Sequence, residues 1–248
     1  MADDRRASRI NVVTLFPEAI APYLGASIIG RAVERQRVEF QLVQIRDFAT
    51  DRHRTVDDTP YGGGAGMVLK PEPLVAAVES IGEPGRVIVM SARGRRFDHR
   101  MAVRLSLEPQ LTVVCGHYKD IDQRAVEVLG AEEVSLGDFI LTGGEPAALC
   151  LIDAVVRLLP GVLGDHESAS SDSFYDGLLS PPSYTRPPEF RGLAVPEVLR
   201  SGNHAQIEAW REQEAERLTA ERRPAVWAAW KKAHEEGGSH GPSVDVDP

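Results

Sequence analysis

Short apolar runs alternate with helical patterns over the N-terminal two thirds of the chain. The runs are rich in valine and isoleucine, as buried β-strands are, and between them apolar residues recur at every third or fourth position. This alternation predicts an α/β layer with a mostly parallel sheet. The expected strands cover residues 10–16, 38–44, 86–90, 111–115 and 133–136, and the expected helices cover residues 25–37, 71–81, 99–107, 122–129 and 145–159.

The pattern changes after residue 163. Residues 164–188 are rich in serine and proline and show little apolar periodicity, which indicates a mobile linker. Beyond it, Asn203 offers an N-cap for a helix at residues 204–218, and a second helix is expected at residues 224–234. The chain is therefore expected to end in a small helical domain, followed by a disordered polar tail.

Composition narrows the class of protein. The chain has 248 residues and a formal net charge of −9, which argues against a broadly positive surface for nonspecific nucleic-acid binding and leaves room for a local basic site. Its longest apolar stretch, residues 147–163, is interrupted by Asp153, Arg157 and Pro160, and its N-terminus lacks the apolar core of a signal peptide. We therefore expect no membrane association and a cytoplasmic location.

The two cysteines predict neither a metal site nor a disulfide. Cys115 and Cys150 both lie inside apolar runs, without the spacing of metal ligands. Both are therefore expected to be reduced thiols of the hydrophobic core.

Two glycine-containing segments follow strand-like runs and mark a candidate ligand site. They are Cys115-Gly116-His117 and residues 136–144. Because glycine has no Cβ, the backbone there can approach a ligand closely and offer its N–H and C=O groups. Asp138 and Thr142 lie among apolar residues, and buried polar groups need partners. The two segments predict an adenosine-type cofactor site, and the structural alternative is a strand followed by a glycine-marked helix start.

A third glycine segment, residues 61–67, matches neither common nucleotide-binding motif. A P-loop needs Gly-Lys-Ser/Thr, whereas Lys70 stands between Leu69 and Pro71. The dinucleotide fingerprint fails because its third glycine would fall at Met67. A flexible or closely packed loop and a plain turn both remain compatible with this segment.

A set of short motifs occurs in a fixed order along the chain. They are Arg46-Asp47-Phe48, residues 51–58, residues 61–67, Cys115-Gly116, Gly137-Asp138, Gly143-Gly144-Glu145, residues 160–164, Asp172-Ser173-Phe174, residues 184–187 and residues 201–204. None of these motifs is unique by itself. Together they strongly resemble the bacterial tRNA (guanine-N1)-methyltransferases of the SPOUT superfamily, over residues 10–211.

The resemblance implies a fold, a cofactor and a reaction. The fold would be a SPOUT-type α/β domain with a parallel sheet and a deep trefoil knot, plus a small C-terminal helical domain, in an obligate homodimer. S-adenosylmethionine would bind in the knot, and the reaction would methylate N1 of the guanosine at position 37 of tRNA, next to the anticodon. The implied parts are a knotted catalytic domain at 1–162, a mobile interdomain linker carrying the catalytic aspartate at 163–188, a helical tRNA-binding domain at 189–236 and a disordered tail at 237–248.

The resemblance also assigns roles to single residues. Asp172, as general base, and Arg157 form the catalytic pair. The glycines Gly62, Gly63 and Gly64, together with Arg54, are expected on the substrate side, and no metal ligands are assigned. The cofactor contacts fall on Gly116, Leu136, Gly137, Asp138, Phe139, Ile140, Leu141, Gly143 and Gly144.

The chain departs from the family pattern at the residues after the tyrosine of the first glycine segment. Lys119 and Asp120 stand where the family usually has Glu-Gly, which leaves a magnesium requirement open. Two alternative functions also stay open, namely a noncatalytic tRNA-binding protein on the same scaffold and a SPOUT methyltransferase that acts on another RNA site. The presence of Asp172 and Arg157 argues against the first, and the motif at residues 51–58 favours guanine N1 over other sites.

Overall fold

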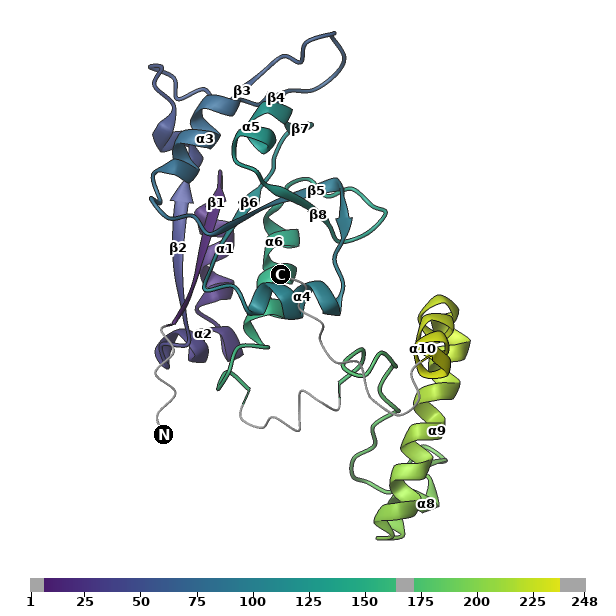
Figure 1. The fold of residues 1–248 in the computed structure, drawn as a ribbon. Coiled ribbons are helices and arrows are strands. Elements are labelled where there is room, and N and C mark those ends of the chain that lie inside the picture. The colour runs from purple at the N-terminus through teal and green to yellow at the C-terminus, as the bar shows by residue number, and fades with distance from the viewer. Residues whose placement is uncertain (1–6, 164–171, 237–248) are drawn as a thin grey trace. The chain divides into compact units, whose positions relative to one another are not determined.

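The computed structural model describes residues 7–163 and 172–236. The chain divides into two compact units between Gly164 and Asp165 (Figure 1). Residues 164–171 of the expected linker and the expected tail at residues 237–248 lie outside the described residues. Within the described residues, no helix is both long and apolar enough to cross a membrane.

A five-stranded parallel sheet forms the centre of the first unit, as the sequence predicted. Every neighbouring pair of strands is parallel, and the strand order is β2-β1-β6-β5-β8. The bounds are Ser8–Thr14 for β1, Val38–Gln44 for β2, Arg86–Arg96 for β5, Gln110–Cys115 for β6 and Glu132–Ser135 for β8.

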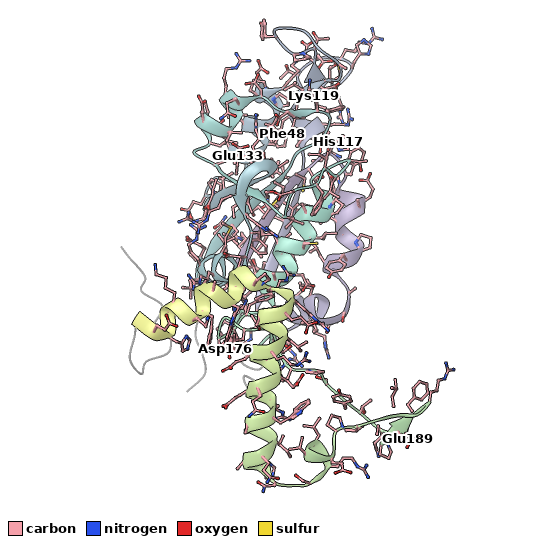
Figure 2. All side chains as sticks on the ribbon, turned by 90° about the vertical axis from the view of Figure 1, so that its right-hand side faces the viewer. Phe48, His117, Lys119, Glu133, Asp176 and Glu189 are labelled. Carbon is pink, nitrogen blue, oxygen red and sulfur yellow. The ribbon has the colours of Figure 1, made fainter. Side chains whose placement is uncertain are left out.

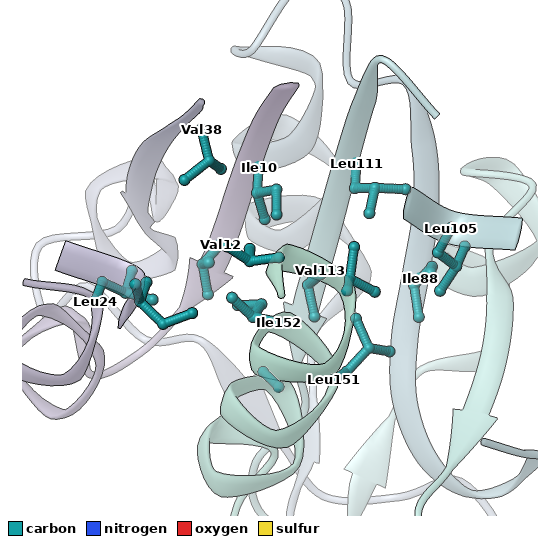
Figure 3. Close-up of a cluster of buried hydrophobic side chains, with 14 of the residues drawn as sticks. Ile10, Val12, Leu24, Val38, Ile88, Leu105, Leu111, Val113, Leu151 and Ile152 are labelled. Carbon is teal, nitrogen blue, oxygen red and sulfur yellow. The ribbon is translucent and has the colours of Figure 1, made fainter. Parts of the chain in front are cut away.

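Helices cover both faces of this sheet. Successive side chains of a strand point to opposite faces, so Ile10 and Val12 of β1 join one buried cluster and Val13 joins the other. On the first face the strands pack against α6, whose Leu151 and Ile152 point at the sheet (Figure 3). The first face carries α1 (Pro17–Leu24), α2 (Ser27–Glu34), α4 (His99–Ser106) and α6 (Glu145–Val156), and the second carries α3 (Pro71–Glu79) and α5 (Gln123–Val128).

The expected elements and the observed ones differ in a few places, each with a local cause. The helix α1 was missed because it is short and contains Pro22, which removes a backbone donor from the helix. Strand β5 was expected to end at residue 90. It continues to Arg96 because its pairing with β8 shifts register between Met90 and Arg95 and then resumes. Two-residue strands and single turns carry no readable periodicity, so β3 (Asp57–Asp58), β4 (Val68–Leu69), β7 (Asp120–Ile121) and the 3-10 helix η1 (Ile45–Phe48) were not predicted.

Over its described residues, the second unit contains a short hairpin and three helices. The hairpin pairs β9 (Glu189–Phe190) with β10 (Leu193–Ala194), and α8 (Glu197–Arg200) follows. The C-terminal helices are confirmed as α9 (His204–Arg222) and α10 (Pro224–Glu236). The Asn203 side chain accepts a hydrogen bond from the Gln206 N–H at 3.3 Å, which confirms the expected N-cap.

The register shift in β5 depends on a glycine. A Cβ added to Gly94 would collide with the backbone of Glu133 and Val134 in β8. We expect Gly94→Ala to lower the free energy of unfolding by about 1–3 kcal/mol, the range typical of overpacking. Urea denaturation followed by circular dichroism measures this change.

Gly25→Ala is the matched control, because a Cβ there would meet its nearest atoms at 3.9 Å, which is ordinary contact. Its effect should stay within about 1 kcal/mol. Equal losses of stability in the two variants would contradict the role of Gly94.

Candidate functional site

The carboxyl ends of β5, β6 and β8 open into one pocket of about 190 Å³. In open parallel sheets, ligands bind outside the carboxyl ends of the strands. The pocket brings together the two glycine segments that the sequence marked. Its lining includes Gly116, Leu136, Gly137, Phe139, Ile140, Leu141, Gly143 and Gly144, which are all of the expected cofactor contacts except Asp138.

The two segments meet through their backbones. The Gly144 N–H donates to the Gly116 carbonyl at 2.7 Å, where β6 has ended and α6 is about to begin. A Cβ on Gly144 would lie 2.7 Å from Gly116 N and 2.8 Å from Cys115 Cα, closer than real side chains approach backbone atoms. Gly144 has a φ of −78°, which any residue can adopt, so the requirement for glycine comes from space and not from conformation.

The rim of the pocket is apolar and exposed. The exposed fractions of Phe139, Ile140 and Leu141 are 54%, 81% and 42%. Among the described residues, the backbone N–H groups of residues 140–143 donate no hydrogen bond to a backbone carbonyl. An apolar rim with available backbone donors is the lining expected for a heteroaromatic ligand that needs both stacking and hydrogen bonds.

The expectation of buried polar side chains in the second glycine segment is wrong. Asp138 and Thr142 are both exposed. Thr142 lines the pocket and Asp138 does not. Their side chains therefore obtain hydrogen bonds from water, and the case for a ligand rests on the glycines and the backbone.

A buried polar cluster beneath the pocket was not predicted. Glu145, at the first position of α6, is only 7% exposed and accepts a hydrogen bond from the Thr14 hydroxyl at 2.7 Å. Burial raises the pKa of the Cys115 thiol well above its usual range, and the nearby Glu145 carboxylate raises it further. A Cβ on Gly143 would collide with Glu145 Oε2 and lie 2.8 Å from His117 Nδ1. Thr14 and Glu145 are 131 positions apart, so no sequence signal links them.

His117 lines the pocket with one ring nitrogen unsatisfied. Its Nδ1 is shielded from solvent and has no hydrogen-bond partner in the described part of the chain. The ring centroid lies 5.0 Å from that of Phe16 and 5.2 Å from that of Tyr118. Figure 2 shows His117 toward the same end of the first unit as Lys119 and Glu133, which also line the pocket.

The third glycine segment lies beside the pocket wall. A Cβ on Gly66 would lie 3.3 Å from Lys119 Cβ, and one on Gly64 would lie 3.5 Å from Lys119 Nζ, whereas Gly62 and Gly63 have open space around them. The segment is therefore closely packed at one end only. The other expected substrate residue, Arg54, is exposed and forms an ion pair with Asp47 at 3.2 Å.

Arginine at the pocket edge is already paired. Arg93 lies 3.1 Å from the Asp120 carboxylate and 3.4 Å from that of Glu133. These pairs are partly exposed, so each contributes little to stability, but they neutralise local charge.

Among the described residues, no group of three histidine, cysteine, aspartate or glutamate side chains is placed to hold a metal ion.

Of the expected catalytic pair, Arg157 does not line this pocket, and Asp172 belongs to the other unit. Arg157 caps the C-terminal end of α6, whereas the pocket lies at the N-terminal end of the same helix. Asp172 belongs to the second unit. There it begins a loop that is closed by hydrogen bonds between Ser173 and Ser180. The joint action of Asp172 and Arg157 stays a prediction.

The chain is similar to known proteins over most of its length. The family model described as tRNA (Guanine-1)-methyltransferase TrmD matches residues 8–229. The chain is 53% identical over 223 residues to a tRNA (guanine-N(1)-)-methyltransferase of Rhizobium etli, covering 89% of this chain and 96% of that protein. Proteins of the same name from Exiguobacterium sibiricum and Geobacter sulfurreducens are 55% and 54% identical over 216 and 219 residues, each covering 87% of this chain and 89% of the relative.

The thiols provide a direct check on the buried cluster. Cys115 is buried as expected, but Cys150 is exposed, so the expectation of two core thiols is wrong for Cys150. In native protein at mildly alkaline pH, iodoacetamide should therefore leave Cys115 unmodified, and mass spectrometry should detect its alkylation only after denaturation. Because the folded state holds the Cys115 proton more tightly, its contribution to stability is present below pH about 8.5 and is lost as the pH rises further. Rapid alkylation of Cys115 in the native state would contradict the geometry.

Proposed function

The chain belongs to the tRNA (guanine-N1)-methyltransferase family, and we propose that it transfers a methyl group from S-adenosylmethionine to N1 of guanosine 37 of tRNA, next to the anticodon. The observation that carries this proposal is the pocket at the strand ends. Eight of the nine residues expected to contact the cofactor line it together, although they come from segments separated along the chain. The location in the cytoplasm is part of the same proposal.

Two features of the pocket support the proposed cofactor. Gly144 lets the two glycine segments meet there, since a Cβ on it would collide with the backbone of Gly116, and residues 139–141 supply an apolar rim. When bound, S-adenosylmethionine supplies an electrophilic methyl group on a sulfonium sulfur. We assign its binding to Gly116, Leu136, Gly137, Asp138, Phe139, Ile140, Leu141, Gly143 and Gly144, with Asp138 supported only by its place in the segment.

Asp172 is the proposed general base. Guanine N1 carries a proton at neutral pH, so its methylation requires that a base remove this proton as the new bond forms. An aspartate in water, with a pKa of about 3.9, is a weak base for this task. Exclusion of water when RNA binds would strengthen the carboxylate as a base. Hydrogen bonds between Ser173 and Ser180 close the loop that follows Asp172. They support this role because a closed loop restricts the backbone that carries the carboxylate.

Arg157 is the proposed partner of Asp172 in catalysis. Loss of the N1 proton moves negative charge onto guanine O6, and a guanidinium directed at O6 would stabilise that charge. A guanidinium also presents planar N–H donors that can be directed at an oxygen such as O6. A cation at the C-terminal end of α6 also interacts favourably with the helix dipole, which gives Arg157 a structural role beside the catalytic one.

The length of α6 supports a homodimer. The helix has 12 residues and begins at the pocket, so at about 1.5 Å per residue Arg157 begins roughly 18 Å away. An arginine side chain spans less than half of that distance. We therefore propose that a pocket in one protomer works with the partner subunit's Arg157, which makes the dimer necessary for activity.

The path of the chain supports the proposed trefoil knot. The chain leaves β8 at the edge of the sheet and returns to place α6 against β6 in its middle. On the way it passes directly beside the loop that follows β6, where Gly144 bonds to Gly116. A trefoil knot requires the chain to thread through a loop, and this contact places the returning segment next to a loop, although knots are rare among protein folds.

Substrate RNA is proposed to contact both units. The second unit, over residues 189–236, is assigned to tRNA binding, and Gly62, Gly63, Gly64 and Arg54 to the substrate side of the first. Support for the glycine loop comes from its contact with Lys119 at the pocket wall. A magnesium requirement stays open, and no metal ligand is assigned.

Nucleoside analysis tests the proposed function. Purified protein is incubated with S-adenosylmethionine and an unmodified tRNA transcript that carries guanosine at position 37, and the digested RNA is analysed by mass spectrometry. We expect 1-methylguanosine, and its loss when position 37 is changed to adenosine. Tight RNA binding without methylation would instead indicate a noncatalytic protein, and a methyl group elsewhere would indicate another target site.

Single-turnover kinetics test the catalytic pair. Asp172→Asn removes the base and should lower the methyl-transfer rate by about 10²- to 10⁴-fold without loss of tRNA affinity. Arg157→Lys keeps the charge but loses the planar donors, and should lower the rate much more than the cofactor affinity. Asp176→Asn is the matched control, because an amide oxygen can still accept the hydrogen bond from Leu178 N–H. Near-normal rates for Asp172→Asn would remove Asp172 as the base.

A further inference from the structure

The second unit contains a groove of about 500 Å³ that the proposed catalytic chemistry does not use. One wall is the proline-rich segment at residues 181–188, and the other is formed by α9, with α8 at one end. The wall segment is anchored on α9, since Leu179 N–H bonds to Thr219 Oγ1 at 2.9 Å and the Tyr184 ring lies against Trp210. A pocket of this size is in the range, about 300–1,000 Å³, that holds a small ligand.

The floor of the groove offers flat and apolar surface. The rings of Tyr184 and Trp210 have centroids 6.4 Å apart and planes inclined by 56°, so they form a corner and do not stack on each other. Tyr184 is 48% exposed, which leaves part of its surface free. The half-buried side chains of Leu199 and Ile207 complete the floor. A planar ring system could therefore lie on Tyr184 over an apolar base.

Positive charge surrounds this floor. Arg186, Arg200 and Arg211 line the groove, and none of the described lining residues is acidic. Arg211 is partly neutralised, because it pairs with Glu208 at 2.6 Å. In the described part of the chain, neither Arg186 nor Arg200 forms an ion pair. Two exposed guanidinium groups next to an aromatic ring thus remain for an anionic ligand.

We propose that this groove binds one unstacked nucleotide of the substrate tRNA, other than the guanosine that is methylated, with its base on Tyr184 and a flanking phosphate on Arg186 and Arg200. Single-stranded RNA is recognised in this way, through stacking of splayed bases on aromatic rings and pairing of phosphates with arginine. The inference rests on the proposed function for the identity of the RNA. It adds a second recognition site, on residues distinct from those of the cofactor pocket.

The chemistry favours RNA over an acidic peptide. Carboxylates would satisfy the guanidinium groups but would leave the exposed aromatic surface of Tyr184 without a planar partner. A nucleotide supplies both a planar base and an anion, at a spacing fixed by its sugar. Guanidinium groups also bind phosphate oxygens through two parallel hydrogen bonds, which an ammonium cannot do.

Equilibrium binding of the full-length protein to the unmodified tRNA transcript, measured over a series of salt concentrations, tests the proposal. Arg186→Gln and Arg200→Gln should each weaken binding and reduce the slope of log K against log salt by about 0.7, the value for one phosphate contact on a single strand. Tyr184→Leu should weaken binding by about 5- to 100-fold, as loss of one stacked base does, and leave the salt slope unchanged.

Two matched variants separate recognition from general effects. Tyr184→Phe keeps the ring and should bind tRNA like the wild type. Arg31→Gln removes an exposed arginine of α2 in the first unit, outside the groove and outside every residue assigned to RNA or cofactor, and should leave the salt slope unchanged. Thermal melting and cofactor binding of every variant check that both units remain folded. If Tyr184→Leu melts early, the Arg186→Gln and Arg200→Gln slopes decide the question alone.

The outcomes distinguish this proposal from the proposed function. If the wild type forms 1-methylguanosine but the groove variants match Arg31→Gln in affinity and slope, the groove proposal is wrong and the function stands. A wild type that does not methylate tRNA would overturn the function itself. Competition by an acidic peptide, with tRNA binding unaffected by the groove variants, would also overturn the groove proposal.

Discussion

The backbone hydrogen bond between Gly144 and Gly116 is the constraint on which the site depends. It holds the start of α6 against the end of β6, so the loops after β5, β6 and β8 enclose one pocket. The contact leaves no space for a side chain at residue 144. Because it consists of main-chain atoms, it does not depend on which side chains stand at neighbouring positions such as Lys119 and Asp120.

Several charged groups at or near the pocket are paired with neighbouring side chains. Glu145 is buried but is bonded to Thr14 and lies at the positive end of the α6 dipole. Arg93 is held at the edge by two carboxylates. What remains for a ligand is an apolar rim, main-chain donors, Lys119 and the ring of His117. The proposed base and the proposed cation accordingly come from elsewhere, Asp172 from the second unit and Arg157 from the far end of α6.

This separation makes the proposed reaction depend on the partner subunit. A cofactor bound in the pocket of one isolated protomer would not have the proposed cation beside it, because a 12-residue helix keeps Arg157 away. Under the proposal, catalysis then requires the partner subunit and bound RNA together. The groove on Tyr184, Arg186 and Arg200 fits the same logic, since a nucleotide held there would couple recognition by the second unit to the position of the target base.

The sequence by itself determined the elements with strong local periodicity and the places where glycine or a cap is required. The parallel strands, most helices, the Asn203 cap and the two glycine segments could be predicted because each depends on residues close together in the chain. Tertiary structure alone decided the rest. The Thr14–Glu145 bond, the exposure of Cys150, the register shift of β5 and the corner formed by Tyr184 and Trp210 all depend on how distant segments pack, and local periodicity reports which side of an element is apolar without reporting what that side meets.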